Sequence, residues 1–155
     1  MNRSIAAAAL ALTYVKAANT CTGLALSGGG SNGAWEMGVL YGLLHYGKPE
    51  DFRYDVVTGI SAGSINAIQL MGYEIGDELK ATEIGSDLWK NLKTSDVWQD
   101  WYVTPLDGLL LKAGMMDNSP LLKFLESLLA PLSEFKRRIT VGTVNINDGT
   151  FHRFD

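Results

Sequence analysis

The sequence Tyr54-Asp55-Val56-Val57-Thr58-Gly59-Ile60-Ser61-Ala62-Gly63 is the strongest indication of the fold, because a strand, a sharp turn and a helix are expected to follow one another within it. We expect the strand over 54–58 and the helix over 63–71. Between them, Gly59-x-Ser61-x-Gly63 matches the nucleophile elbow, a strand-to-helix turn that lifts a serine hydroxyl above the sheet edge. Glycines on either side leave room where the two backbones approach. Ser61 is therefore the candidate nucleophile.

A second strand is expected upstream, over the apolar run Thr22–Ser27, which is typical of a strand buried on both faces of a parallel sheet. A glycine loop over 28–33 follows it, and a largely buried helix is expected over Ala34–Tyr46. Strand, helix and strand then form a crossover unit, whose two strands run parallel. Both strands end at one edge of the sheet, so the glycine loop and Ser61 should meet there.

The glycine loop reads Ser27-Gly28-Gly29-Gly30-Ser31-Asn32-Gly33. Consecutive glycines can turn backbone N–H groups toward one point. A carbonyl attacked by Ser61 would develop negative charge there, and fixed backbone donors beside a helix N-terminus stabilise such an oxyanion. The sequence therefore predicts an oxyanion hole at Gly28, Gly29 and Gly30.

Three other interpretations of this loop compete with the oxyanion hole. Gly28-x-Gly30-x-x-Gly33 satisfies the dinucleotide-binding fingerprint, but the next strand runs into the elbow and does not end at an acidic residue. A phosphate-binding P-loop fails, because Ala34 and Trp35 stand where lysine and serine or threonine are required. The third interpretation is a glycine-rich strand-to-helix turn with no catalytic role. It explains poorly why a Gly-x-Ser-x-Gly motif is expected at the same edge of the sheet.

The rest of the chain completes an α/β pattern without repeats or linkers. The stretch from Trp98 to Met116 is apolar but aperiodic, and either shapes an acyl pocket or a flap, or belongs to the core. Asn147-Asp148-Gly149 is expected to form a tight turn. The remaining expected elements are a helix over 78–92, a helix over 119–129 capped by Ser119, and strands over 137–146 and 150–154.

Composition limits the chain to one domain and narrows its partners. Its 155 residues are 46% apolar, and the net charge of −4 without any basic block argues against nucleic acid. Residues 1–18 combine an early arginine with an apolar run and resemble a signal peptide, which predicts a secreted or endomembrane-lumen protein; the alternative is a hydrophobic helix that stays attached. No cofactor is expected, and the sequence contains no metal-ligand cluster.

The pair of glycine motifs, about thirty residues apart, resembles the patatin-like phospholipase family over roughly Gly23–Asp155. The resemblance implies a three-layer α/β fold in which helices flank a mostly parallel sheet, here over 22–155. It implies that a serine and an aspartate form a catalytic dyad, that the glycine loop is the oxyanion hole, and that acyl esters of lipids are hydrolysed. Carried over, Ser61 matches the nucleophile and the loop glycines match the oxyanion hole. The remaining motif glycines are Gly33 of the loop and Gly59 and Gly63 of the elbow.

Two departures from the family pattern concern Asn32 and the aspartate. Asn32 stands where many members carry arginine or lysine, which affects the positioning of the loop but not its backbone donors. The family's aspartate lies in an Asp-Gly pair well beyond the elbow, where this chain offers Asp107-Gly108 and Asp148-Gly149. Asp107 falls in the aperiodic stretch and Asp148 in the expected turn, so we expect the dyad aspartate beyond Asp155.

A hydrolase triad of Ser61, Asp148 and His152 is available in chain order, but both partners flank the expected hairpin. His45, near the end of a helix, is interpreted as a polar helix-end residue. We therefore expect a lipid acyl hydrolase of phospholipase or acylglycerol lipase type, with a lipid ester as substrate and transient contact with a membrane surface. The alternative is a catalytically inactive relative that binds lipid or serves a structural role.

Overall fold

The structure is a computed structural model that describes residues 21–101, 116–132 and 134–155. The predicted signal peptide, Asp107 and most of the apolar stretch between Trp98 and Met116 lie outside the described residues.

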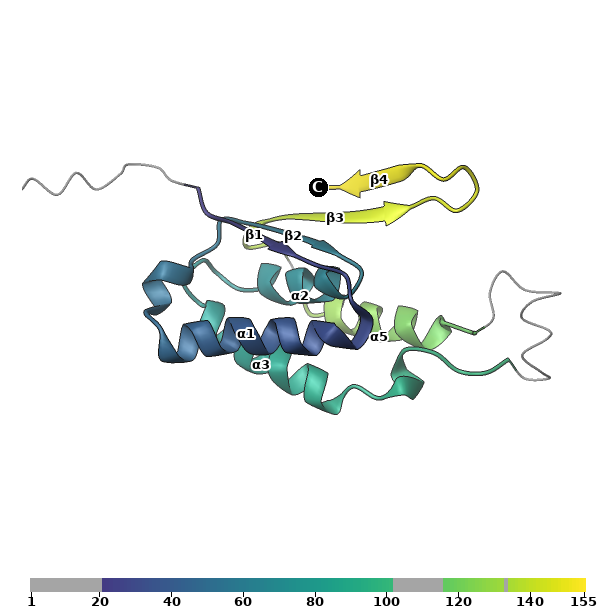
Figure 1. The fold of residues 1–155 in the computed structure, drawn as a ribbon, viewed down its shortest axis with the longest axis horizontal. Helices are drawn as coiled ribbons and strands as arrows, with labels where there is room; N and C mark the ends of the chain where they lie inside the picture. The colour runs from purple at the N-terminus through teal and green to yellow at the C-terminus, as the bar shows by residue number, and fades with distance from the viewer. Residues whose placement is uncertain (1–20, 102–115, 133) are drawn as a thin grey trace, which may run out of the picture.

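Four strands form one sheet in the order β1-β2-β3-β4 (Figure 1). β1 and β2 pair in parallel, β2 and β3 pair in parallel, and β4 returns antiparallel to β3. The predicted mostly parallel α/β sheet is confirmed, and so is the crossover unit that links its first two strands. The strands span β1 (Gly23–Leu26), β2 (Val56–Ile60), β3 (Arg138–Val144) and β4 (Phe151–Phe154).

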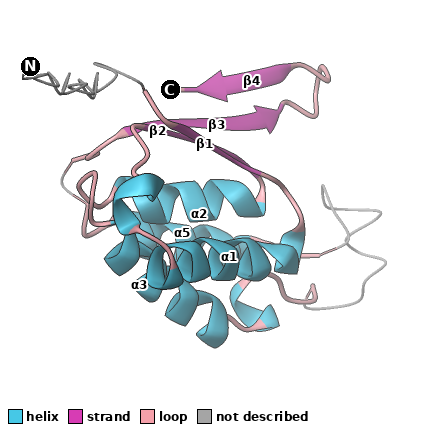
Figure 2. Ribbon diagram, turned by 60° about the vertical axis from the view of Figure 1, so that its left-hand side comes forward, coloured by secondary structure: helices cyan, strands magenta, loops and turns pink. Residues whose placement is uncertain are grey.

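The described helices gather on one face of this sheet (Figure 2). These helices flank the sheet, as the predicted three-layer α/β fold requires. The described residues form two of its layers, the sheet and one layer of helices. Their bounds are α1 (Gly33–Tyr46), α2 (Ala62–Met71), α3 (Glu78–Asn91) and α5 (Ser119–Leu129), with 3₁₀ turns η1 (Gly30–Asn32), η2 (Pro49–Phe52) and η3 (Thr94–Asp96).

The core lies between the sheet and these helices. Val57 of β2 and Leu70 of α2 are completely buried and contribute to one cluster with Leu26 of β1 and Leu40 of α1. Burying a leucine or valine side chain stabilises a fold by about 1.5–3 kcal/mol relative to leaving it exposed. This packing fixes α2 against the parallel strands, and α2 begins at the elbow.

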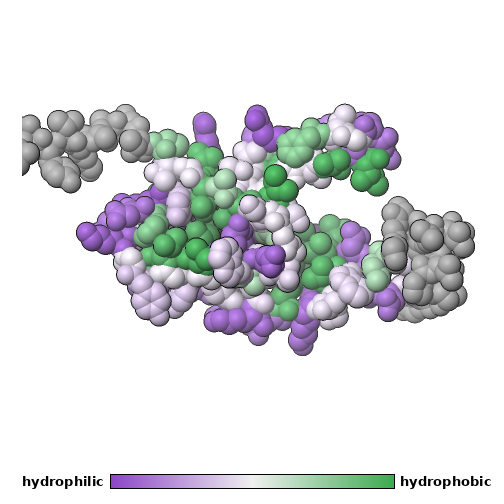
Figure 3. Space-filling model, viewed as in Figure 1, coloured by the Kyte–Doolittle hydropathy of each residue, from purple (hydrophilic) through white to green (hydrophobic). Residues whose placement is uncertain are grey.

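Two burial predictions are wrong. β1 buries one face only, because the described helices cover a single side of the sheet (Figure 2). On α1, Met37, Leu40 and Leu44 are buried, whereas Trp35 is 73% exposed and Val39 and Leu43 are also exposed. Apolar side chains also gather over the β3–β4 hairpin, where Val144 and Phe151 are exposed (Figure 3).

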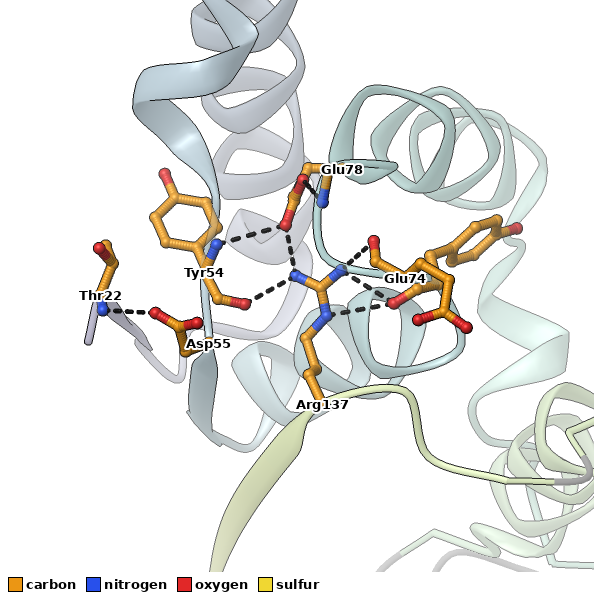
Figure 4. Close-up of polar contacts among 8 residues, drawn as sticks. Thr22, Tyr54, Asp55, Glu74, Glu78 and Arg137 are labelled. Atoms are coloured by element: carbon orange, nitrogen blue, oxygen red, sulfur yellow. Dashed lines mark hydrogen bonds and ion pairs between the residues drawn. The ribbon is translucent and has the colours of Figure 1, made fainter. Parts of the chain in front are cut away.

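A buried ion pair ties together the amino ends of the strands, opposite the edge that carries Ser61. The guanidinium Nη1 of Arg137 lies 2.7 Å from Oε1 of Glu78, and both side chains are almost completely buried. Arg137 also donates to the backbone carbonyls of Tyr54, Tyr73 and Glu74 (Figure 4). The two charges are thus both paired and hydrogen-bonded, which offsets the large cost of burying a charge away from water.

Candidate active site

Ser61 occupies a backbone conformation that side chains rarely adopt. Its φ is 54° and its ψ is −122°, and it is the one non-glycine residue with positive φ within the described part of the chain. Such a conformation costs on the order of 1–3 kcal/mol and persists only where the surroundings impose it. Here β2 ends at Ile60 and α2 begins at Ala62, so the chain reverses at Ser61 itself. The side chain is exposed.

The two glycines of the elbow sit where backbone meets backbone. A Cβ on Gly63 would lie 2.5 Å from the carbonyl oxygen of Leu26 and 2.7 Å from that of Ser27. A Cβ on Gly59 would overlap the carbonyl oxygen of Gly63. These contacts are with main chain, which cannot turn aside as a side chain could. The glycines therefore let the elbow approach the end of β1.

The glycine loop lies directly beside Ser61. Leu26 pairs with Gly59 in the parallel register, so both strands deliver their ends to the same edge. A Cβ on Gly28 would lie 3.2 Å from the Cβ of Ser61. Gly30, with φ at +57°, then turns the chain into η1. The structure thus brings together the serine and the glycines that the sequence analysis singled out.

A cavity of about 680 Å³ opens at this edge of the sheet. Ser61 and Gly30 both line it, while Gly28 and Gly29 line a separate, smaller hollow. Ile65 and Ile68, four and seven positions beyond Ser61 on α2, form part of its wall, as the helical repeat requires. The wall is mostly apolar and includes Trp98, Leu121 and Leu125; Lys93 is the charged side chain among the described residues that line it.

Three polar residues behind the loop were not anticipated from the sequence. Glu36 of α1, Asn66 of α2 and Trp89 of α3 form one hydrogen-bonded group with the backbone of Ser27 and Gly33. None of them belongs to a recognised motif. In the sequence, Asn66 could have indicated this group, because it is a polar residue among the apolar positions of its helix.

Asp148 and His152 are engaged in the hairpin. Asp148 accepts hydrogen bonds from the hydroxyl and then the backbone N–H of Thr150, which lower the pKa of this carboxyl group. The Nε2 of His152 lies 2.8 Å from the same hydroxyl. Asn145 N–H bonds the Thr150 carbonyl and Gly149 has φ of +72°, so the predicted turn is confirmed. Neither Asp148 nor His152 lines the cavity.

His45 lies in the last turn of α1 and stacks on Tyr41, with ring centroids 5.2 Å apart. This placement agrees with a helix-end role. Within the described residues, no cluster of histidine, cysteine, aspartate or glutamate is suited to hold a metal ion.

The family comparison agrees with this geometry: the model of the patatin-like phospholipase family matches residues 24–154. The chain belongs to the patatin-like phospholipase family. The match spans both glycine motifs and all four strands except Gly23, the first residue of β1, and it confirms the resemblance drawn from the two motifs. No curated protein and no solved structure matched the chain. Among the residues that the structure describes, no helix of this patatin-like protein has the length and apolar content to cross a membrane.

Proposed function

We propose that the protein hydrolyses acyl esters of lipids, with Ser61 as the nucleophile and the loop Gly28–Gly30 as the oxyanion hole. Membership of the patatin-like phospholipase family supports lipid acyl hydrolysis in general. The observation that carries the specific assignment is the strained, exposed Ser61, which lies beside Gly28 and lines a largely apolar cavity. Backbone strain of this kind concentrates at functional positions.

The proposed reaction begins when the hydroxyl oxygen of Ser61 attacks the ester carbonyl carbon. The carbonyl π electrons move to oxygen, and the loop amides together with the N-terminus of α2 stabilise that charge. The tetrahedral intermediate then expels the alcohol, which takes up a proton, and leaves an acyl-enzyme. Water attacks the acyl-enzyme in the same way and releases the fatty acid.

Proton transfer from Ser61 needs a general base. The described residues that line the cavity include no carboxylate or imidazole, and Asp148 is held in its turn. We therefore assign the base to an aspartate outside the described residues. An aspartate has a reference pKa of about 3.9 and is a weak base, so it must be held within hydrogen-bond reach of the hydroxyl.

The apolar wall of the cavity supports a fatty acyl group as the part of the substrate that is recognised. Transfer of each methylene from water into such a wall contributes about 0.8 kcal/mol. A chain along α2 would meet Ile65 first and Ile68 next, one helical turn apart. The proposed substrates are therefore phospholipids or acylglycerols with long acyl chains, reached by transient contact with a membrane surface.

The pattern of residues 1–18 supports a secreted or lumenal location for this activity. Expression in a secreting host and N-terminal sequencing test it. A mature chain that begins near Ala18 or Asn19 is expected, and an intact N-terminus inside the cell would contradict it.

The function is tested by measuring fatty acid release from mixed phospholipid and acylglycerol micelles. Turnover by the full-length wild-type protein that disappears in Ser61→Ala is expected. Ser127→Ala is the matched control, because Ser127 lies exposed on α5 and bonds the carbonyl of Phe124. It should leave turnover unchanged.

The alternative is a catalytically inactive relative that binds lipid or serves a structural role, and the apolar cavity would suit lipid binding without turnover. Lipid binding by both wild type and Ser61→Ala, without turnover by either, would select that alternative.

A further inference from the structure

Glu36 and Asn66 form a hydrogen-bonded pair directly behind the glycine loop. The Nδ2 of Asn66 donates to Oε2 of Glu36 at 2.9 Å and to the carbonyl of Gly33 at 3.0 Å. The other carboxylate oxygen of Glu36 accepts the backbone N–H of Ser27 at 2.8 Å. The pair therefore spans from the residue that precedes Gly28 to the helix that begins after Ser61.

The hydrogen bonds fix the orientation of the Asn66 amide. Asn66 is completely buried, and its Oδ1 accepts the indole N–H of Trp89 at 2.7 Å. Because an indole N–H can only donate, Oδ1 must face Trp89, and Nδ2 must face Glu36 and the Gly33 carbonyl. Glu36 is consequently required as an acceptor on both of its oxygens.

These hydrogen bonds connect the glycine loop with α2, two parts of the site that are far apart in the sequence. Ser27 immediately precedes the loop, and Asn66 stands five residues after Ser61 on α2, a packed helix. The Trp89 ring also fills the space that a Cβ on Gly33 would need. Displacing Glu36 would free the Ser27 N–H, and the position of the Gly28 amide relative to Ser61 would no longer be held.

We propose that Glu36 and Asn66 are positioning residues that hold the oxyanion loop against the nucleophile helix. The proposal rests on the proposed function for its catalytic consequence. Oxyanion stabilisation depends on donors that are already in place when charge develops. A misplacement of about 1 Å can lower a rate by about a hundredfold. Loss of the pair should therefore lower kcat, while binding of the acyl chain along the cavity wall stays intact.

The test is Glu36→Gln, which keeps the size of the side chain. The glutamine oxygen can still accept the Ser27 N–H, but its amide nitrogen then faces Nδ2 of Asn66, so two donors meet. Turning the Asn66 amide cannot relieve this, because its nitrogen would then face the Trp89 N–H. Trp89→Phe, which removes the indole N–H together with the five-membered ring, is a second variant in case Glu36→Gln does not fold. Because Trp89 also lines the cavity, this variant is read by exchange of the loop peptide, which should accelerate.

Asp55→Asn is the matched control. The Oδ2 of Asp55 accepts the backbone N–H of Thr22 at 2.7 Å, just before β1 begins (Figure 4). Both substitutions exchange a carboxylate for an amide at a backbone N–H that flanks β1, that of Thr22 or that of Ser27. They lie at opposite ends of that strand, and only Glu36 is at the loop.

Two readouts are measured on the three variants and the wild type: the kinetics of ester hydrolysis, and hydrogen–deuterium exchange of the peptide covering Ser27–Asn32. Glu36→Gln should lower kcat by about 10- to 100-fold with KM within about threefold, and exchange of this peptide should accelerate. Asp55→Asn should change kcat by less than about twofold at a similar melting temperature, with exchange of the loop peptide unchanged.

The outcomes separate this inference from the proposed function. Unchanged exchange in Glu36→Gln overturns the positioning role whether or not the chain is active. Faster exchange with unchanged kcat overturns its catalytic consequence. Absence of Ser61-dependent turnover in the wild type overturns the proposed function instead, and exchange still decides whether the pair holds the loop.

Discussion

Gly63→Ala is the substitution whose effect follows most directly from the distances in the elbow. The added Cβ would lie 2.5 Å from the carbonyl oxygen of Leu26 and 2.7 Å from that of Ser27. Ordinary contact begins near 3.4 Å, so α2 and the end of β1 must separate by about 0.9 Å. The same movement draws the glycine loop away from Ser61.

Two quantities should change together. Overpacking of this kind typically costs about 1–3 kcal/mol of folding free energy, which lowers the melting temperature of a chain of this size by about 3–10 °C. A shift of about 1 Å between nucleophile and oxyanion donors should lower kcat by about a hundredfold. Thermal unfolding and ester hydrolysis measure the two effects on one preparation.

Gly42→Ala provides the control for this change. Gly42 lies inside α1, and a Cβ there would meet no atom within 4 Å. Alanine favours a helix interior over glycine by about 1 kcal/mol, so this variant should be more stable and equally active. A Gly63→Ala variant that retains wild-type kcat would refute the claim that this close approach sets the geometry of the site.

Three further outcomes follow from the structure. Ile68→Phe should shift the preference toward shorter acyl chains in a chain-length series, because Ile68 lines the cavity about 10 Å along α2 from Ser61; an unchanged preference would place the acyl chain elsewhere. Lys93→Gln should lower kcat/KM on anionic phospholipids by about fivefold and leave neutral acylglycerols unaffected, since the attraction between unit charges in water is about 1 kcal/mol at 4 Å; equal effects on both lipids would contradict this. Burial, and then the Glu78 carboxylate, raise the pKa of Tyr54, so stability that is present below the ordinary tyrosine pKa of about 10 is lost as pH rises through the folded value. Tyr54→Phe should flatten the alkaline end of the stability curve measured by denaturant titration, and an unchanged slope would count against this assignment.

The sequence predicted the elbow and its position beside the glycine loop because both rest on local rules. Gly59-x-Ser61-x-Gly63 specifies the turn, and the parallel crossover places the ends of both strands at one edge. The same local signals missed the start of α5 by one residue, since Asn118 and not Ser119 occupies the capping position. Helix ends depend on one or two residues and are harder to place than the helix itself.

The burial of individual side chains and their polar partners could not be predicted from the sequence, because both depend on contacts between elements that are far apart in it. Trp35 is exposed because no described element covers that side of α1, although its sequence suggested a buried helix. Glu36 and Asn66 are thirty positions apart and belong to different helices, so their hydrogen bond emerges only from the packing of α1 against α2. The same holds for the ion pair of Glu78 with Arg137.

Covalent labelling with a fluorophosphonate, followed by mass spectrometry of the labelled peptide, tests whether Ser61 is an activated nucleophile, because the probe reacts with an activated serine that faces an oxyanion hole. One adduct is expected, on Ser61, that is absent from Ser61→Ala and forms more slowly in Gly63→Ala. A protein that stays unlabelled, or that carries the adduct on another serine, would contradict this assignment.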